Sequence, residues 1–105
     1  MGTAEKHISR LKKLNTTECL WVYILKILSG GPSHAYVLRR RIERGFGFRP
    51  GAVTAYKVLY DLRRMGLVTK RKEGMKRIYC ITQRGRSDLN KAAVFYRELA
   101  KKLEK

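Results

Sequence analysis

At 105 residues the chain fits one small domain, since domains run from about 50 to 250 residues. Its 25 Lys and Arg against 8 Asp and Glu give a formal net charge of +17, which is typical of nucleic-acid-binding domains, although membrane surfaces and acidic proteins also attract such a chain. The most apolar run, residues 19–28, contains Lys26 and falls short of the roughly 20 apolar residues of a membrane helix, which excludes a transmembrane span.

The first part of the chain is predicted to contain two helices. Residues 4–14 carry apolar side chains at helical spacing among Lys and Arg, which indicates an amphipathic arm within residues 1–16. Asn15, Thr16 and Thr17 are N-cap candidates for a second helix that runs to about Leu28. Because that helix is apolar on nearly all sides, we expect it to be central and partly covered by a partner subunit.

Residues 33–64 are predicted to form a helix-turn-helix. The first helix runs from about Ser33 to Arg44, with Gly45 as its C-cap. The second covers residues 52–64, begins after the N-cap Gly51 and stops at Gly66. Its inward-facing apolar stripe consists of Ala55, Val58, Leu59 and Leu62.

Residues 67–82 are predicted to form a two-stranded wing, with strands at 67–72 and 76–82 around a glycine-containing turn. Thr82 is expected to cap a last helix over residues 83–105. The fold class is therefore mainly α with a small β-wing. A winged helix-turn-helix at residues 17–82 lies between the arm and the C-terminal helix in a single domain of residues 1–105.

The face of helix 52–64 that lies away from its apolar stripe is a candidate DNA-reading surface. Lys57 can donate to guanine, Thr54 can bond a base edge or a phosphate, and the Val53 methyl groups can touch thymine. An ordinary solvated helix face is the alternative. Tyr56 can bond a phosphate or bury its ring, and for Tyr36 core packing is the favoured choice. The candidate set on this helix is Val53, Thr54, Tyr56, Lys57, Tyr60 and Arg64.

The wing adds a dense run of cations that suits phosphates beside the groove, or an Arg inserted into the minor groove. The alternative is a solubilising edge, since Lys also protects exposed strands, and the two roles can coexist. The candidate residues are Lys70, Arg71, Lys72, Lys76 and Arg77.

Other chemistries find little support in the sequence. Cys19 and Cys80 belong to no zinc-binding pattern and are interpreted as core residues rather than as a disulfide or a redox sensor. His7 and His34 are unsuitably spaced for a chelate, so we expect no metal and no cofactor. No set of residues that could carry a reaction is present, which argues against an enzyme. The lack of a secretory signal pattern favours a cytoplasmic, nucleoid-associated protein.

Four stretches, in this order, resemble the PadR family of winged helix-turn-helix transcriptional regulators, in particular its short archaeal-type members. They are Leu20 to Leu25, Gly31 to Tyr36, Thr54 to Leu62 and Tyr79 to Gly85, and the likeness spans about residues 17–103. The chain departs from the family where relatives commonly carry a Pro after a cap Ser and then a Gly, because it has Gly51-Ala52-Val53 there. A second departure is Gly74-Met75-Lys76-Arg77, where relatives often hold Gly-Arg-Pro at the wing tip.

The resemblance implies a homodimer that binds a pseudo-palindromic operator in double-stranded DNA, usually as a repressor. In such a dimer the last helix packs against the first helix of the partner. The corresponding interface residues here would be Trp21, Leu25, Leu89, Tyr96, Leu99 and Leu103. A small, flat apolar effector beside Trp21, Phe95 and Tyr96 is a further hypothesis, although subunit packing explains these aromatic residues without a ligand.

We therefore expect a dimeric, sequence-specific regulator whose two recognition helices enter successive major grooves about 34 Å apart. The leading alternative is an architectural or chromatin protein that coats DNA without sequence preference, which the +17 charge would serve equally well. A third hypothesis is an adaptor that uses the winged helix to hold an acidic protein or RNA.

Overall fold

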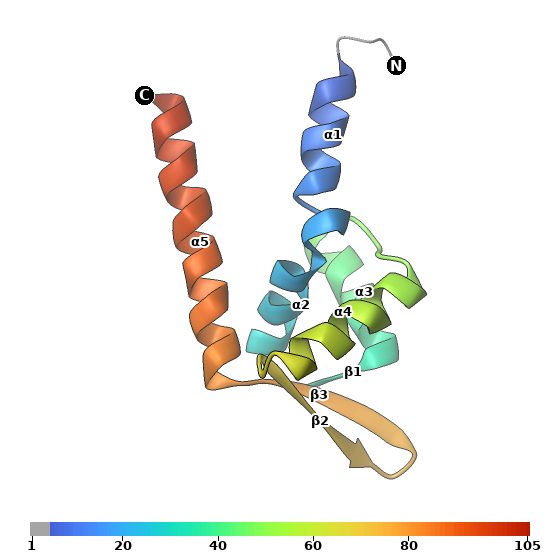
Figure 1. Cartoon of the computed structure of the whole chain (residues 1–105). Helices are drawn as coiled ribbons and strands as arrows, with labels where there is room; N and C mark the ends of the chain where they lie inside the picture. Colours follow the sequence, from blue (N-terminus) through green and yellow to red (C-terminus); the bar gives the residue numbers. More distant parts are fainter. Residues whose placement is uncertain (1–4) are drawn as a thin grey trace.

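The computed structural model describes residues 5–105, and Figure 1 shows a small body from which two helices and a hairpin project. The molecule is elongated, with extents of 51 × 30 × 22 Å. Helices α1 and α5 extend from one end of the body, and the β2–β3 hairpin extends from the other (Figure 1). In chain order the elements are α1 (Lys6–Leu14), the 3₁₀ turn η2 (Thr17–Cys19), α2 (Leu20–Ser29), β1 (Ser33–His34), α3 (Ala35–Phe46), α4 (Ala52–Arg64), β2 (Val68–Glu73), β3 (Lys76–Ile81) and α5 (Gln83–Glu104).

The helix predicted over residues 52–64 is confirmed, since α4 has these bounds and Gly51 is its N-cap. The prediction that Thr82 caps the last helix is also confirmed, because its Oγ1 accepts a hydrogen bond from the Gly85 backbone N–H at 3.1 Å. The same hydroxyl donates to the Gly66 carbonyl at 2.8 Å. One side chain therefore fixes the start of α5 to the loop that follows α4.

The wing hairpin is confirmed, but the sheet has three antiparallel strands in the order β1-β3-β2, not two. Strand β1 pairs with β3 through Ser33 opposite Tyr79 and His34 opposite Ile78. The prediction that a helix begins at Ser33 is wrong, because these two residues are in the strand and α3 begins at Ala35. A two-residue strand is too short to show the alternation from which strands are predicted.

Two predicted helix ends are corrected. Gly45 lies inside α3, and the C-cap is Gly47, whose φ of +80° is a left-handed conformation that glycine adopts without a steric cost. The predicted N-cap role of residues 15–17 is wrong, because no side chain caps η2 or α2. The Asn15 amide and the Thr16 hydroxyl instead donate back to the Leu11 and Lys12 carbonyls, at 2.9 and 2.7 Å, and close the end of α1.

The core is formed where α2, α3, α4 and the base of the sheet meet. Helix α2 contributes four fully or nearly buried side chains, those of Leu20, Ile24, Leu25 and Leu28. Leu25 is 0% exposed within its own chain, so its side chain has no surface to offer a partner, and we remove it from the predicted dimer interface. The other apolar side chains of α2, including Trp21, are half-buried.

Helices α1 and α5 are poorly covered by the rest of the chain. No residue of α1 is buried, and in α5 only the residues Gly85 and Ala92 are buried. Large apolar side chains along these two helices are exposed: Ile8, Leu11, Leu14, Val94, Phe95, Leu99 and Leu103. Within residues 5–105, no helix has the length and apolar character to cross a membrane.

Candidate nucleic-acid interface

The exposed face of α4 is built by the helical period of its sequence. Ala55, Leu59 and Leu62 are buried against the core, and Val58 is half-buried. The side chains on the other side of the helix project away from the core, and that of Val53 is 83% exposed. We use the name reading face for six residues on this side, all of which are exposed: Val53, Thr54, Tyr56, Lys57, Tyr60 and Arg64.

Two members of the reading face contact each other. The Arg64 guanidinium carbon lies 5.9 Å from the centroid of the Tyr60 ring, a cation–π distance. This contact draws the Arg64 side chain back along α4 toward Tyr60 (residues four apart share one side of a helix). Lys57 lies about one turn, and Val53 about two turns, nearer the N-terminus of α4 than Tyr60.

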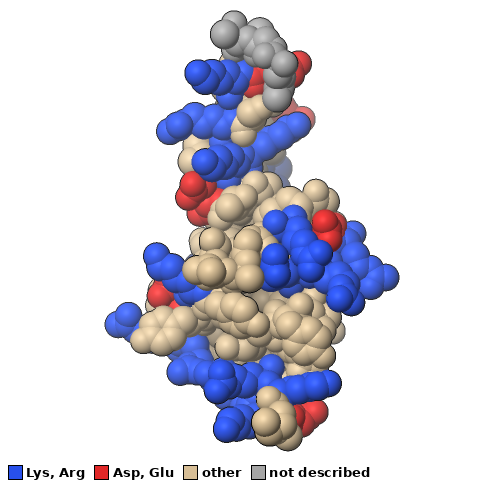
Figure 2. Space-filling view, turned by 90° about the vertical axis from the view of Figure 1, so that its right-hand side faces the viewer, with Lys and Arg blue, Asp and Glu red and all other residues tan. Residues whose placement is uncertain are grey.

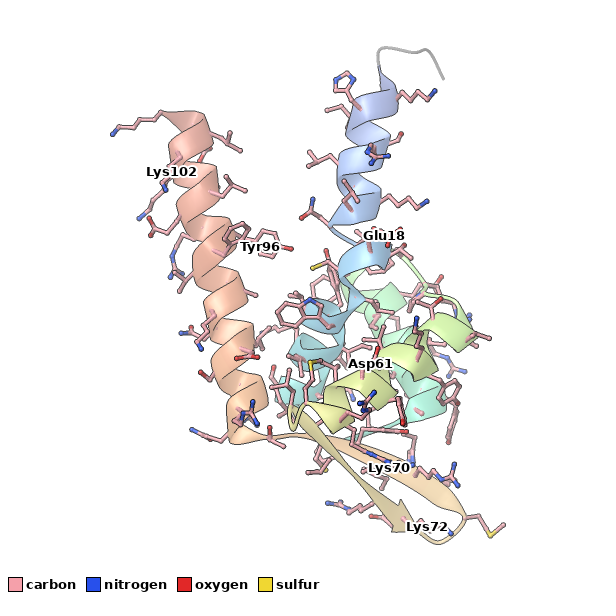
Figure 3. The ribbon with its side chains drawn as sticks, viewed as in Figure 1. Glu18, Asp61, Lys70, Lys72, Tyr96 and Lys102 are labelled. Carbon is pink, nitrogen blue, oxygen red and sulfur yellow. The ribbon has the colours of Figure 1, made fainter. Side chains whose placement is uncertain are left out.

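The hairpin presents all five of its predicted cations to solvent, and we call Lys70, Arg71, Lys72, Lys76 and Arg77 the basic hairpin. Lys72 pairs across the ladder with Arg77, so like charges lie directly opposite each other. Such an arrangement is unfavourable in a free hairpin, and a bound polyanion relieves it. Figure 3 labels Lys70 and Lys72 on this element.

Lys70 and Arg71 differ in their surroundings. Partial loss of solvent, together with the positive charges of Arg63, Arg77 and Lys72, lowers the pKa of Lys70. Arg71 forms an exposed ion pair with Glu73 at 3.6 Å, and its Nη1 lies 3.6 Å from the Cys80 sulfur. Lys70 therefore lies among cations, whereas part of the charge of Arg71 is compensated.

A groove between the hairpin and the start of α3 extends this surface. It has a volume of about 420 Å³ and is lined by Tyr36, Tyr56 and Tyr79 together with Lys72, Lys76 and Arg77. The Lys76 ammonium lies 6.0 Å from the Tyr36 ring centroid. Burial raises the pKa of Tyr79, whose ring packs at the edge of the core.

The preference for packing Tyr36 in the core is wrong, because the side chain is 56% exposed. Its ring stacks on His34, with centroids 5.6 Å apart, and faces the groove beside the hairpin. Tyr36 and Tyr79 thus join the predicted residues around one surface. Only the fold reveals this, since strand β1 places them beside residues that are distant in sequence.

Charge is distributed unevenly over this side of the molecule. Figure 2 shows Lys and Arg gathered over the hairpin at the bottom, over α1 at the top and along one side between them. The exposed aromatic residues Tyr36 and Tyr56 share a groove with Lys72, Lys76 and Arg77, and Tyr60 lies beside Arg64. Aromatic and basic side chains interleaved on one surface are typical of nucleic-acid interfaces.

A second uncovered region lies at the other end, where α1 and α5 face each other. A cavity of about 500 Å³ there is lined by Leu11, Tyr23, Tyr96, Leu99 and Leu103, among others. Tyr96 points from α5 toward α1 and α2 (Figure 3) and donates a hydrogen bond to the Cys19 sulfur at 3.6 Å. Burial, followed by this hydrogen bond, raises the pKa of Tyr96 to about 12.

The structure also places the residues considered for redox, metal and effector chemistry. Cys19 lies beside α5 and Cys80 lies in the wing, and both thiols are free and half-buried rather than core residues. Among residues 5–105, no group of three or more His, Cys, Asp or Glu side chains could hold a metal ion. Trp21, Phe95 and Tyr96 do line one hollow, of about 410 Å³, between α2 and α5.

A helix-turn-helix that is followed by an extended basic hairpin, with the hairpin part of a three-stranded sheet, defines a winged helix-turn-helix DNA-binding protein. The model of the transcriptional regulator PadR-like family matches residues 24–91. The chain belongs to this family, and it is therefore a DNA-binding transcriptional regulator and not an enzyme. A comparison with curated proteins gives no match.

Solved structures share the fold. A PadR-like transcription factor from Bacteroides fragilis is 19% identical, with a TM-score of 0.76 over 90% of this chain and 96% of that one. A transcriptional regulator from Clostridium thermocellum is 22% identical, with a TM-score of 0.72 over 80% and 87%. Bacillus subtilis PadR in complex with operator DNA is 24% identical, with a TM-score of 0.64 over 72% of this chain and 47% of that one.

Proposed function

We propose that the protein is a sequence-specific regulator that binds a pseudo-palindromic operator as a homodimer and represses transcription by occupying it. The observation that carries this proposal is the exposed reading face of α4 beside the basic hairpin. A helix with an outward face of mixed character can read base edges, while uncompensated cations beside it hold phosphates.

Each part of the surface has a distinct task in this proposal. Lys57 donates to O6 or N7 of guanine, Thr54 bonds a base edge or a phosphate, and the Val53 methyl groups contact thymine. Tyr56 and Tyr36 bond phosphates through their hydroxyl groups. The basic hairpin contacts the phosphates that flank the major groove or places an Arg in the minor groove. The B. subtilis relative, which was solved with operator DNA, supports this use of the fold.

The homodimer is supported by the apolar surface that α1 and α5 leave uncovered. Seven large apolar side chains on two helices, beside a cavity of about 500 Å³, form a surface of the kind that marks a protein interface. The α5 helix of a second copy fits this proposal, since it would cover Leu99 and Leu103 of the first copy and have its own apolar side chains covered in return. Trp21, Leu89 and Tyr96 are half-buried and stay in the proposed interface.

A specificity measurement tests the proposal against the architectural alternative. The operator is first selected from a random duplex library, and its Kd is then compared with that of a scrambled duplex at physiological salt. A regulator should discriminate by a factor of about 10³ or more. Equal affinity for the two duplexes would instead support a protein that coats DNA.

The salt dependence tests the role assigned to the basic hairpin. Each phosphate that the protein no longer neutralises should reduce the slope of log affinity against log salt by about 0.9. Replacement of Lys72 and Arg77 with Ala should therefore flatten the slope by about two such steps and leave the discrimination between duplexes nearly unchanged. An unchanged slope would remove the hairpin from the interface. The Lys101→Ala and Lys102→Ala changes near the end of α5 provide the control for charge.

A further inference from the structure

Helix α3 carries two arginines, Arg40 and Arg44, that have no task in the proposed function. They follow Tyr36 at intervals of four residues, so the three side chains lie on one side of the helix. The buried residues Leu38 and Ile42 lie on the other side, and all three members of the row are exposed. We call Tyr36, Arg40 and Arg44 the α3 row.

Packing within the chain accounts for the neighbouring arginines but not for Arg40. Arg39 and Arg41 are half-buried and donate hydrogen bonds to the carbonyls of Pro50 and Ile27, at 2.7 and 3.3 Å. Within residues 5–105, neither arginine of the α3 row forms an ion pair. Like charges four residues apart destabilise a helix, and a bound polyanion relieves that repulsion.

Two further charges bear on the α3 row. Arg44 lies in the last turn of α3, where the negative end of the helix dipole favours a cation, so its position has a partial explanation in the fold. Glu43 is the acidic residue of α3, and it forms an exposed ion pair with Arg49 of the following loop at 3.8 Å. Because Glu43 is directed to Arg49, it leaves the charge of the α3 row largely uncompensated.

The α3 row begins at the groove beside the basic hairpin. Tyr36 lines this groove together with Lys72, Lys76 and Arg77. The Lys76 ammonium lies 6.0 Å from the Tyr36 ring centroid. At a rise of about 1.5 Å per residue, Arg44 lies about 12 Å further along α3 than Tyr36. The α3 row therefore continues the basic surface of the hairpin along the body of the molecule.

The α3 row and the hairpin belong to the same side of the molecule. Figure 1 shows α3 and the free end of the hairpin on one side of the body, and Figure 2 faces that side. Lys and Arg extend there from the hairpin along one edge toward α1 (Figure 2). A DNA backbone that meets the hairpin thus has a further cationic surface beside it.

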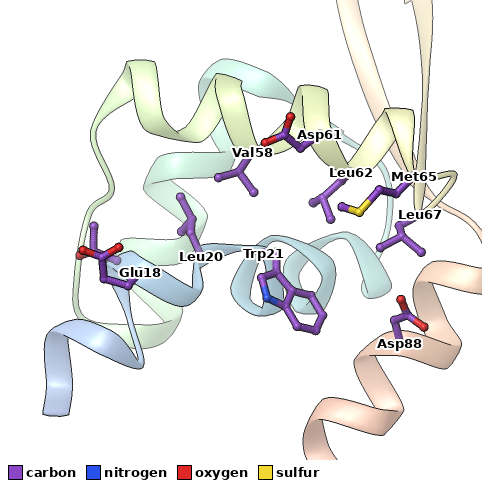
Figure 4. A pocket seen from close by; sticks show the side chains of 10 residues that line it. Glu18, Leu20, Trp21, Val58, Asp61, Leu62, Met65, Leu67 and Asp88 are labelled. Carbon is purple, nitrogen blue, oxygen red and sulfur yellow. The ribbon is translucent and has the colours of Figure 1, made fainter.

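The other flank of α4 is acidic. A groove of about 360 Å³ is bounded there by α2, α4 and the first turns of α5, and Glu18, Asp61 and Asp88 lie around it (Figure 4). None of the 25 Lys and Arg residues is among the described residues that line it. Tyr56 and Asp61, five residues apart, lie on opposite flanks of α4. A phosphate backbone beside the reading face is therefore attracted toward the hairpin and α3 and repelled from the acidic flank.

We propose that the α3 row binds the phosphate backbone of the operator, beyond the phosphates held by the basic hairpin. This inference rests on the proposed function and adds a second phosphate-binding surface to it. Arginine suits the task, because its guanidinium stays charged and can donate two parallel hydrogen bonds to one phosphate. Phosphate contacts carry no sequence information, so the α3 row adds affinity for every duplex and fixes the orientation of the protein on the DNA.

The salt dependence of DNA binding tests the α3 row in the double variant Arg40→Ala and Arg44→Ala. Two lost phosphate contacts should reduce the slope of log affinity against log salt by about 1.8. Between about 50 and 200 mM salt, the variant should therefore lose about tenfold less affinity than the wild type. The slope should flatten equally on the operator and on a scrambled duplex, and the discrimination between them should be unchanged.

Two control variants separate phosphate binding from effects on net charge or on the fold. Arg40→Lys with Arg44→Lys keeps both charges and should keep the wild-type slope. Lys101→Ala with Lys102→Ala removes the same charge from the exposed end of α5 and should also leave the slope unchanged. Thermal unfolding of Arg40→Ala should show an unchanged or slightly raised Tm, since Ala favours the helix and the like-charge pair with Arg44 is removed.

Three outcomes would overturn the inference. An unchanged slope in the alanine double variant would remove α3 from the interface. A slope that also flattens in the lysine double variant would assign the effect to the fold, and equal flattening in the α5 control would assign it to net charge. All three leave the proposed function intact as long as the wild-type protein distinguishes the operator from a scrambled duplex, whereas loss of that discrimination would refute the proposed function itself.

Discussion

Lys57 lies in the exposed part of α4 and makes no ion pair within residues 5–105, so its ammonium is free to meet DNA. A base contact by such a side chain contributes about 1 to 3 kcal/mol of discrimination. We predict that Lys57→Ala raises the Kd for the selected operator more than the Kd for a scrambled duplex, as measured by fluorescence anisotropy. Lys91→Ala, an exposed change on α5, is the control. Equal weakening on both duplexes would reassign Lys57 to a phosphate.

Lys70 offers a test through pH. Partial desolvation and three neighbouring cations lower its pKa in the free protein, whereas a phosphate beside it would favour the charged form. We predict that the pKa of Lys70 rises when DNA binds, so that its contribution to DNA affinity is fully present below the pKa of Lys70 in the free protein and is lost as pH rises through the higher pKa of Lys70 in the complex. Nuclear magnetic resonance of the Lys Nζ groups measures this directly. An unchanged pKa in the complex would place Lys70 outside the interface.

At the scale of elements, the junction between α5 and the wing depends on Gly85. A Cβ atom there would lie 2.2 Å from the Leu67 carbonyl oxygen and 2.7 Å from Cγ1 of Ile81. Overpacking of this kind costs about 1 to 3 kcal/mol, which outweighs the gain of about 0.5 to 1 kcal/mol from Ala in a helix. We predict that Gly85→Ala lowers the free energy of unfolding, as measured by urea denaturation.

Gly45 is the matched control for that substitution. It lies inside α3, and an added Cβ would meet only Cδ1 of Ile27, at an ordinary contact distance of 3.9 Å. Gly45→Ala should therefore raise the free energy of unfolding by about 0.5 to 1 kcal/mol. If Gly85→Ala raised the free energy of unfolding as Gly45→Ala is expected to, the close approach of Gly85 to Leu67 would be wrong.

Sequence patterns predict an element only when the element is long enough to repeat its hydrophobic period. The stripe of α4 and the two strands of the hairpin are both found where expected, because their signals extend over many residues. The burial of the strands does not alternate, because β2 is exposed after Val68. Strand β1 has only two residues and shows no period. Gly45 and Gly47 both suit a helix end, and only the chain geometry selects Gly47.

Packing between segments that are far apart in sequence cannot be predicted from such patterns, for a different reason. Helix α2 is apolar on nearly every side, so its sequence does not reveal whether its own chain or a partner covers Leu25. Tyr36 is exposed because β1 turns it toward the hairpin, which no local pattern indicates. Likewise, Glu18, Asp61 and Asp88 come from three separated segments and form no motif.

At the scale of the whole molecule, the basic hairpin and the apolar surface of α1 and α5 lie at opposite ends. Assembly through α1 and α5 would cover the apolar end and leave both hairpins free for DNA. We predict that the double variant Leu99→Glu and Leu103→Glu is monomeric at micromolar concentration in sedimentation and binds the operator more weakly than the wild type. Asn90→Glu adds a charge at another exposed position of α5 and should remain dimeric. A monomeric wild-type protein would refute the dimer.

Hydroxyl-radical footprinting of the selected operator tests most directly whether two reading faces act together on one site. Two α4 helices held by a dimer should protect two segments on one face of the duplex, with centres about 34 Å, or one helical turn, apart. Protection should disappear on a scrambled duplex at the same protein concentration. Continuous protection of both duplexes, without this spacing, would contradict the account and indicate a protein that coats DNA.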